Sequence, residues 1–164
     1  MANQVKVKLT GAKRTQRRMT KVARKFKDFE SANLAAAIAL RRWIDLNFKA
    51  EGARHENSFG PWKPLHPVTI EKRRQGKGSG TAKILQDTGA LRSRWEVRAN
   101  RSFGEVESRQ DYSRIHENGG IAMIDGRTVK VPRRKILPGV GQTKKIALKA
   151  YQGFVDKVVV KGLK

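Results

Sequence analysis

The sequence predicts an α+β fold: a small, mostly antiparallel β-sheet packed against two or three helices, with long loops and terminal arms. Three observations support this prediction. Apolar residues recur at three- and four-residue steps near both ends of the chain, which is the helical period. Between residues 95 and 108, apolar and polar residues alternate with the period of two that strands show. Glycine and proline interrupt the chain between these stretches. For a chain of 164 residues we expect one domain, residues 1–164, with a core of its own.

The charge is the most unusual feature of the composition. The net charge is +23, from 37 Lys and Arg against 14 Asp and Glu. Residues 1–30 carry 10 basic and 2 acidic residues, residues 126–164 carry 11 and 1, and the longer stretch between them carries 16 and 11. The domain therefore has basic N-terminal and C-terminal segments. This excess predicts a polyanionic neighbour, either nucleic acid or an acidic protein surface. The alternative interpretation is solubility combined with charge complementarity in an assembly.

Composition also argues against several classes of protein. The chain has no cysteine, which excludes a disulfide framework and a thiolate metal site. No apolar run approaches the roughly 20 residues that a membrane helix needs. The N-terminus lacks the apolar core of a signal peptide. We therefore expect a soluble product of the cytoplasm with no membrane partner.

The N-terminal region predicts a strand followed by a basic helix. Residues 4–9 alternate apolar residues with lysines, which predicts a short strand with one buried face. Residues 12–29 carry apolar side chains at helical steps and predict an amphipathic helix. The basic residues of its outer face are Arg14, Arg17, Arg18, Lys21, Arg24 and Lys25. This face either contacts phosphates or is simply solvated.

A second helix is predicted over residues 32–50, with Ser31 as its N-cap and an Ala-rich start that favours helix. We expect it to be the longest helix and to pack on the sheet. In the polar loop that follows, Trp62 lies between two prolines and is predicted to tuck in as an anchor. Pro67 fits the first position of a short helix that ends at Arg74.

Residues 75–82, QGKGSGTA, have the composition of a flexible linker. Its Lys77, which follows Arg73 and Arg74, is a candidate contact for a phosphate or for an acidic neighbour. The linker is no nucleotide-binding P-loop, because the required Gly-Lys-Ser/Thr ending is absent.

Two short helices flank a predicted hairpin. Thr88 is predicted to cap the first, over residues 89–94, with Leu91 as its inward anchor. Asp111 is predicted to cap the second, which Gly119-Gly120 ends. The residues expected on its buried side are Tyr112, Ile115 and His116.

The hairpin itself is predicted from residues 95–100 and 103–108, joined by a turn at 100–102 and exposing one face to water. Gly104 is expected at a bulge or at a close approach of another backbone.

The remainder of the chain predicts an edge strand, a basic loop and a helix. Residues 121–125 fit either a strand or an ordered loop, and residues 128–131 fit an edge strand that Pro132 closes. Arg133-Arg134-Lys135 is a basic loop, and residues 136–138 are predicted to anchor it.

The C-terminal helix is predicted over residues 142–157. The residues expected to face inward are Ile146, Ala147, Ala150, Phe154 and Val158. Val158-Val159-Val160 favours β structure and predicts a final strand or an arm that adds to a neighbour's sheet edge.

The histidines do not form a recognisable active site. His55-Glu56-Asn57 and His116-Glu117-Asn118 superficially resemble metal-nuclease motifs, but neither has a second histidine at i+4 or a compact carboxylate cluster. We expect His116 to pack beside Ile115 and to bond the backbone. The prediction is therefore no enzyme, with no catalytic residues, no metal and no cofactor. A small nuclease that uses the histidines is kept as a distant rival.

Several segments together resemble a known family. The pattern "ILQDTGALR", a hairpin and then "DYSRIHENGG" resembles the virion-morphogenesis, or tail-completion, proteins of tailed bacteriophages of the phage Mu type. The upstream "NFKAEG…PWKPLHPVTIEKRR" and the downstream "VPRRKILPGV" resemble segments of the same proteins, so the likeness covers about residues 40–140. The chain departs from the usual pattern at residues 54–59, at Ser113 and at "RRKILP", where the usual Arg-Pro-Phe is missing.

The resemblance implies a structural protein of the virion neck or tail end, assembled in the host bacterial cytoplasm. Such a protein acts in tail completion or head–tail joining, as a ring homo-oligomer around the DNA channel, which we expect to be a hexamer. The implied partners are neighbouring neck, tail-tube or head-connector proteins and the DNA in the channel. A sequence-nonspecific nucleic-acid-binding protein is the alternative. The interface candidates are residues 54–65, 73–82 and 158–164.

The candidate contacts to DNA or to an acidic partner are the basic residues of three segments. They are Arg14, Arg17, Arg18, Lys21, Arg24, Arg73, Arg74, Lys77, Arg133, Arg134 and Lys135. A ring of such basic chains would repel itself, and a uniformly basic lumen would retain the DNA. We therefore expect most of the basic excess to meet acidic proteins and only a subset to face DNA.

Overall fold

The computed structural model describes residues 12–26, 28–54, 60–76, 78, 81–124 and 126–163. The strand predicted for residues 4–9 and the candidate Lys77 lie outside the described residues. The helices are α1 (Ala12–Phe26), α2 (Glu30–Lys49), α3 (Pro67–Arg74), α4 (Ala90–Ser93), α5 (Ser113–Asn118) and α6 (Val140–Leu163). The strands are β1 (Trp95–Ala99), β2 (Gly104–Ser108), β3 (Gly120–Ile124) and β4 (Arg127–Val131).

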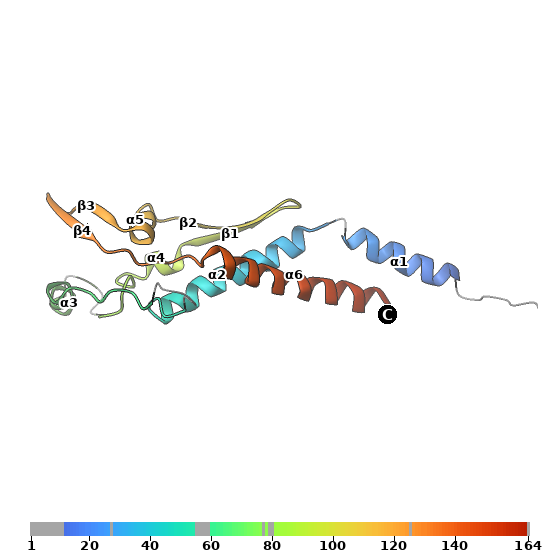
Figure 1. Ribbon diagram of the computed structural model, residues 1–164, viewed down its shortest axis with the longest axis horizontal. Coiled ribbons are helices and arrows are strands. Elements are labelled where there is room, and N and C mark those ends of the chain that lie inside the picture. Colours follow the sequence, from blue (N-terminus) through green and yellow to red (C-terminus); the bar gives the residue numbers. More distant parts are fainter. Residues whose placement is uncertain are drawn as a thin grey trace, which may run out of the picture.

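The molecule is elongated, and α2 forms its middle layer (Figure 1). One side of α2 packs against α6, and another side packs against the antiparallel β1–β2 hairpin. At one end of the molecule α1 extends beyond this body, and at the other end lie α3 and the β3–β4 hairpin (Figure 1). The predicted α+β class is confirmed, but the strands form two separate two-stranded sheets and not one sheet.

Small residues let α2 be covered on two sides. Ala32, Ala36 and Ala37 are buried, so the neighbouring backbones approach the helix closely. The closest approach is at Gly104, where an added Cβ would overlap the Asn33 carbonyl oxygen and lie 2.9 Å from the carbonyl carbon. The prediction of a close approach at Gly104 is therefore confirmed.

Gly104→Ala is expected to lower the free energy of unfolding by about 1–3 kcal/mol, because the α2 backbone cannot move away from the added methyl group. The matched control is Gly153→Ala in α6, where an added Cβ meets nothing within 4 Å. That change should stabilise the protein by about 0.5–1 kcal/mol through helix propensity. Urea unfolding of both variants measures the two effects, and a shift of the same sign in both would contradict the packing account.

Asn33 connects the three layers. Its Nδ2 donates to the Asn100 carbonyl in the β1–β2 turn at 2.8 Å. Its Oδ1 accepts from the Tyr151 hydroxyl on α6 at 2.7 Å. Because Asn33 is 5% exposed, these two bonds satisfy a polar group that would otherwise be costly to bury.

Several predicted helix ends differ from the structure. α2 begins at Glu30 and not after Ser31, since the Asp28 carboxylate accepts from the Glu30 backbone N–H at 3.1 Å. The cap position of α4 is Gly89, although the Thr88 hydroxyl still accepts from the Ala90 N–H at 3.3 Å.

At α5 the predicted cap is also wrong. The cap position is Tyr112, no side-chain cap bond is made, and Tyr112 is exposed and not buried. The predicted stop at Gly119 is confirmed, since its φ of 73° is a conformation that glycine adopts without strain.

The longest helix is α6, with 24 residues, and not α2, with 20. The difference arises because Val158-Val159-Val160 is helical, which contradicts the predicted strand or arm. Val158 follows Phe154 by one turn and is buried, and Phe154 meets Phe26 of α1 edge-on with ring centroids 6.4 Å apart. Burial on this helical face outweighs the β preference of the three valines.

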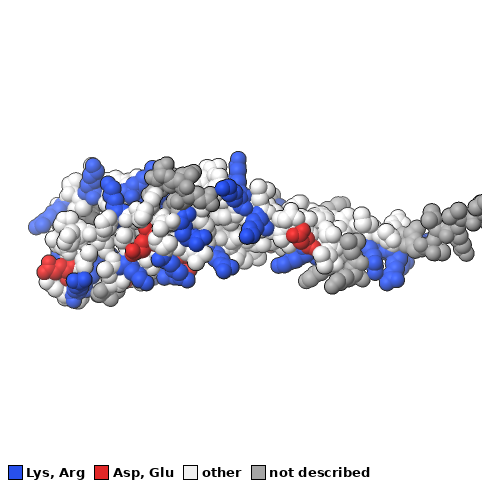
Figure 2. All heavy atoms as spheres, turned by 60° about the horizontal axis from the view of Figure 1, so that its bottom comes forward, with Lys and Arg blue, Asp and Glu red and all other residues white. Residues whose placement is uncertain are grey.

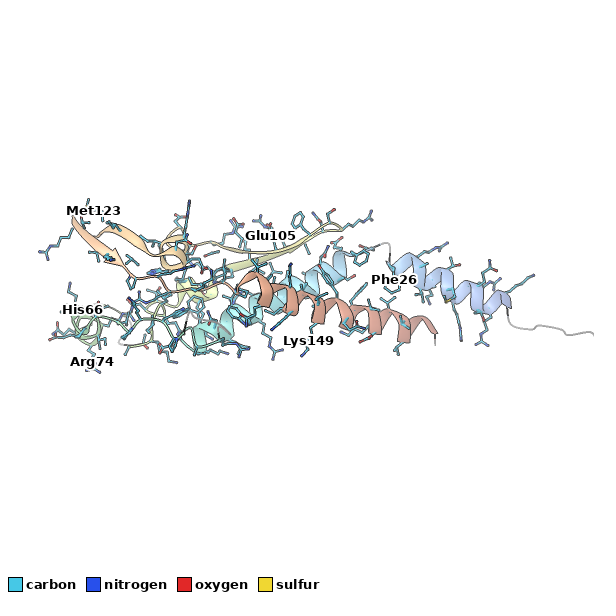
Figure 3. All side chains as sticks on the ribbon, viewed as in Figure 1. Phe26, His66, Arg74, Glu105, Met123 and Lys149 are labelled. Atoms are coloured by element: carbon cyan, nitrogen blue, oxygen red, sulfur yellow. The ribbon has the colours of Figure 1, made fainter. Side chains whose placement is uncertain are left out.

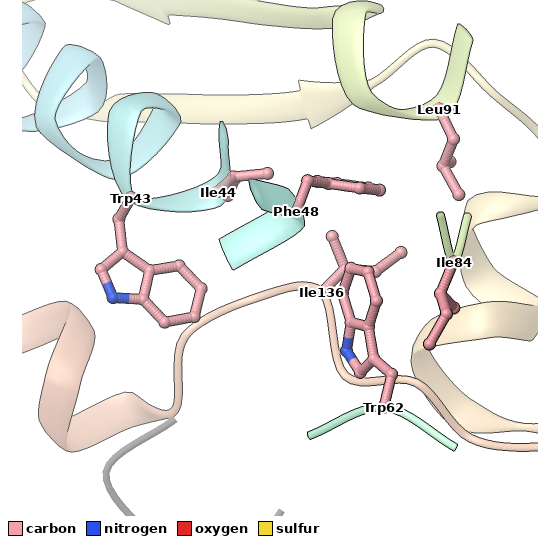
Figure 4. Close-up of a cluster of buried hydrophobic side chains, with 7 residues drawn as sticks. All are labelled: Trp43, Ile44, Phe48, Trp62, Ile84, Leu91 and Ile136. Carbon is pink, nitrogen blue, oxygen red and sulfur yellow. The ribbon is translucent and has the colours of Figure 1, made fainter. Parts of the chain in front are cut away.

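The main core lies where the C-terminal half of α2 meets the loops around Trp62 and Ile136 (Figure 4). Phe48 is fully buried and meets the Trp62 ring edge-on, with centroids 5.2 Å apart. The Trp62 indole N–H donates to the Lys135 carbonyl at 2.8 Å. The predictions that Trp62 and Ile136 act as anchors are confirmed, whereas Leu137 is exposed.

Candidate partner-binding surfaces

The predicted cations that the structure describes lie at opposite ends of the molecule. Five are on α1, at the end that projects from the body (Figure 1). Arg73 and Arg74 are on α3, and Arg133, Arg134 and Lys135 follow β4, at the other end. Figure 2 shows a face on which the Lys and Arg of the described residues are spread along the body and α1, with few acidic residues between them.

The basic side of α1 faces solvent. Arg14, Arg17, Lys21 and Arg24 are exposed, and no carboxylate of the described residues pairs with them. Arg18 is half-buried and has an interaction partner. The opposite side of the helix is only partly covered, since Phe26 packs on Phe154 while Met19 is 57% exposed. α1 therefore offers a neighbour both unpaired cations and an apolar side chain.

At the other end, the structure forms a groove with a volume of about 850 Å³. It lies between α3, the start of α4, α5 and β4, and in Figure 3 the labelled His66, Arg74 and Met123 mark this end. The apolar residues of its wall include Pro64, Leu65, Leu85, Leu91, Val129 and Val131. Its charged residues are Lys63, Arg73, Lys130, Arg133, Arg134 and Asp87. We call this feature the α3–β4 groove.

Arg134 is the most buried cation of the groove. It is 7% exposed, and its guanidinium donates to the carbonyls of Lys63 at 3.1 Å and Pro64 at 3.5 Å. No carboxylate of the described residues pairs with it. Burial, and then the charge of Arg73, lower the pKa of Arg134. Within the described part of the chain the guanidinium is therefore held by carbonyl dipoles alone, and no carboxylate there neutralises its charge.

Arg73 is also held in place by carbonyls. It donates to the Thr81 carbonyl at 3.1 Å and to the Lys83 carbonyl at 3.0 Å, and its Nε lies 3.7 Å from the Asp87 carboxylate. Asp87 is the one carboxylate among the described residues of the groove wall, so the cations there outnumber it.

Two other basic residues that the sequence predicts as partner contacts do not line the groove. Arg74 is exposed on α3, outside the groove wall. Lys135 turns away and pairs with Glu117 at 3.2 Å, with both side chains largely buried. The basic loop predicted at residues 133–135 is thus divided between the wall of the groove and an internal ion pair.

His116 lies on the groove wall and packs edge-on against Tyr112, with ring centroids 6.1 Å apart. Its buried Nδ1 has no hydrogen-bond partner among the described residues, so the predicted backbone bond is not made through this nitrogen. Burial first, and the nearby Arg134 second, lower the pKa of His116 below its ordinary value of about 6.5.

This shift predicts a pH-dependent stability. Because the pKa of His116 is lower in the folded chain, the unfolded chain binds the proton more readily. The contribution of His116 to folding stability is therefore full above pH 6.5 and is lost as the pH falls from there through the folded-state pKa. His116→Phe keeps an aromatic ring beside Tyr112 and removes the titration. We expect its free energy of unfolding to fall less steeply than that of the parent between pH 7.5 and 5, measured by urea unfolding. Equal slopes of the free energy of unfolding against pH in the two proteins would contradict the assignment of this pH dependence to His116.

Sequence reasoning did not identify the whole groove. It missed Lys63, Lys130 and the apolar wall, which come from separate parts of the chain. The available signals were weak: Lys63 belongs to the Trp-Lys-Pro-Leu segment, and Lys130 alternates with Val129 and Val131. Nothing local indicates that these two segments meet.

A family model described as the phage virion morphogenesis family matches residues 10–151. The chain belongs to the phage virion morphogenesis family. The resemblance seen over residues 40–140 is thereby confirmed at the level of the family, and the match extends to α1 and to the first half of α6. Comparison with curated proteins and with solved structures finds no significant match.

Membership of the phage virion morphogenesis family suggests a structural or assembly role associated with the virion and not a catalytic one. Within the part of the chain that the structure describes, no helix is long and apolar enough to cross a membrane. In the same part of the chain, no three His, Asp or Glu side chains gather into a group that could hold a metal ion.

Proposed function

We propose that this protein is a structural component of the virion neck or tail end that acts in tail completion or head–tail joining, as a ring around the DNA channel. The observation that carries the proposal is the family match over residues 10–151, which includes both α1 and the α3–β4 groove. Both candidate surfaces thus belong to the family's part of the chain.

The shape of the molecule supports a ring. Closed rings are built from head-to-tail contacts, in which two different surfaces of the same chain meet. Here the ends of the elongated molecule differ: one presents the projecting α1, and the other presents the groove and the β3–β4 hairpin (Figure 1). Ile121 and Met123 of that hairpin are more than 70% exposed. The projecting α1 and the β3–β4 hairpin are candidate contacts between copies, together with residues 54–65 and 73–82.

The charge limits where DNA can lie in such a ring. Each phosphate that a lumen cation neutralises adds salt-sensitive affinity, which would oppose the passage of DNA. We propose that most of the basic excess contacts acidic neighbouring proteins and that only a subset faces DNA. This placement would be refuted by a structure of the assembled particle in which the lumen is lined together by Arg14, Arg17, Arg18 and Lys21.

The test is to image purified virions and to locate this chain in them. A ring of the protein at the head–tail junction or at the tail end is the expected result. Its absence from the particle, together with a monomer at all concentrations in solution, would overturn the proposal. Such a result would leave an assembly factor or the alternative function.

The alternative is a sequence-nonspecific nucleic-acid-binding protein, which the exposed and unpaired cations of α1 favour. On this alternative, DNA affinity falls steeply between low and moderate salt, and each lost phosphate contact reduces the slope of log K against log salt by about 0.9. Replacing Arg17 and Lys21 by glutamine should then reduce the slope. Replacing the exposed Lys144 and Lys149 of α6 is the matched control. Equal slopes in both variants would contradict a specific role of α1.

A further inference from the structure

We propose that the α3–β4 groove is the receptor for an extended, acidic segment of a neighbouring virion protein, which places carboxylates on the groove cations and an apolar side chain against the groove wall. This inference deepens the proposed function, because it assigns a partner to a surface of the virion protein. It requires that such a neighbour exists and does not require the ring.

Among the residues that the structure describes, the charge of the groove is unbalanced. Five cations line it against the single carboxylate of Asp87, and that carboxylate already lies beside Arg73. Arg134 has only carbonyl partners among the described residues, and Lys63 and Lys130 are exposed. An acidic ligand would therefore supply the negative charge that the described residues do not bring to the groove.

The two central guanidinium groups are oriented before any ligand arrives. Carbonyls of residues 63 and 64 hold Arg134, and carbonyls of residues 81 and 83 hold Arg73. Little side-chain entropy is then lost on binding, which favours affinity. A planar guanidinium in a fixed orientation also suits the two oxygens of a carboxylate.

The apolar wall distinguishes a peptide from nucleic acid. Leucine, valine and proline side chains contribute much of the lining. The backbone of DNA offers such a wall only small sugar C–H groups next to charged phosphates, whereas a peptide can place a whole aliphatic side chain against it. The volume of about 850 Å³ lies within the range of sites that enclose a ligand of a few residues and is small for a duplex.

The strand that borders the groove favours an extended ligand. Val129, Lys130 and Val131 of β4 line it consecutively, whereas the face of a strand would contribute only alternate residues. β4 therefore presents an edge to the groove. β3 occupies the other edge, and within the described chain no further strand pairs with β4. An unpaired edge is the usual place for a peptide to add as a strand.

The experiment uses the 164-residue chain and fluorescently labelled peptides of about ten residues, a length that spans a strand. The probe combines Asp and Glu with two leucines. Comparison peptides replace the leucines by serine, replace the acids by lysine, or carry alternate N-methyl groups that remove backbone donors. A single-stranded oligonucleotide of equal charge is the nucleic-acid probe. Fluorescence anisotropy gives each dissociation constant.

The test variant is Lys63→Glu with Lys130→Glu, because both side chains are exposed and their replacement leaves the core intact. The control variant is Lys144→Glu with Lys149→Glu, which changes the net charge equally on α6. We expect saturable binding of the acidic probe, at least about tenfold weaker binding to the test variant, and less than a twofold change for the control. The serine and N-methyl peptides should also bind about tenfold more weakly.

Three results would overturn the inference. Equal losses in the two variants would show nonspecific attraction to a basic protein. An oligonucleotide that binds as tightly as the acidic probe and loses affinity in the test variant alone would assign the groove to nucleic acid. N-methyl or serine peptides that bind as tightly as the probe would exclude the extended, anchored mode. All of these readouts use the isolated protein, so they stand apart from the location of the chain in the virion.

Discussion

Replacing Phe48 with alanine is expected to lower the free energy of unfolding by about 3–5 kcal/mol. Phe48 is fully buried, and its ring meets Trp62 edge-on within the cluster that also holds Ile44 and Ile136 (Figure 4). The loss combines the buried area of the ring with the cavity that it leaves, because the surrounding aromatic side chains cannot collapse fully into the space.

Urea unfolding with linear extrapolation measures this loss. Leu148→Ala is the matched control, since Leu148 is also helical and apolar but is 67% exposed, and its replacement should cost about 0.5 kcal/mol or less. Phe48→Leu should fall between the two. A cost for Phe48→Ala no larger than that for Leu148→Ala would show that this cluster is not the stabilising core.

Glu117→Ala is expected to cost about 2–4 kcal/mol. Its carboxylate accepts from the backbone N–H groups of Ile136 at 2.6 Å and Leu137 at 3.0 Å, and it pairs with Lys135 at 3.2 Å. Only 16% of the Glu117 side chain and 19% of the Lys135 side chain are exposed. Alanine would leave two backbone donors and a largely buried ammonium group without this acceptor.

Glu117→Gln keeps an acceptor and removes the charge, so its cost should be smaller than that of alanine. The matched control is Glu71→Ala on the exposed side of α3, which should change the free energy of unfolding by about 0.5 kcal/mol or less. Urea unfolding again measures all three variants. Equal costs for Glu117→Ala and Glu71→Ala would contradict the role of Glu117 as the support of the β4–α6 connection.

The Glu117 variants also bear on the groove. The Glu117 backbone carbonyl accepts from Arg133, and the His116 carbonyl accepts from the Arg134 backbone N–H at 2.7 Å. The end of α5 thus positions the connection that carries both arginines. Even where Glu117→Gln remains folded, we expect it to weaken the binding of the acidic peptide probe more than Glu71→Ala does.

Local patterns in the sequence were good predictors of individual elements. The alternation over residues 95–108 predicted the β1–β2 hairpin, and Pro67 predicted the start of α3, because both signals act between near neighbours. The sequence also predicts Trp62 and Leu91 as anchors, because each is a large apolar side chain in a polar stretch, and both are buried.

The errors arose where distant contacts compete with local preference. Val158-Val159-Val160 is β-favouring by composition, yet these residues are helical because Val158 is buried on the α6 face next to Phe154. Ser31 is a good cap by type, but Asp28 forms the bond at the start of α2. Secondary-structure and capping preferences differ between residue types by small free energies. The burial of one side chain, or one alternative hydrogen bond, is enough to reverse such a preference.

The sequence by itself determined the α+β class, the family, most of the helices and strands, and the concentration of basic residues near the two ends. Only the tertiary structure decided which basic residues lie together. It joins Arg73 with Arg133 and Arg134 in one groove and turns the adjacent Lys135 to Glu117. The physical reason is that charge and periodicity are local properties of the chain. A binding surface, in contrast, depends on which distant segments the buried core brings together.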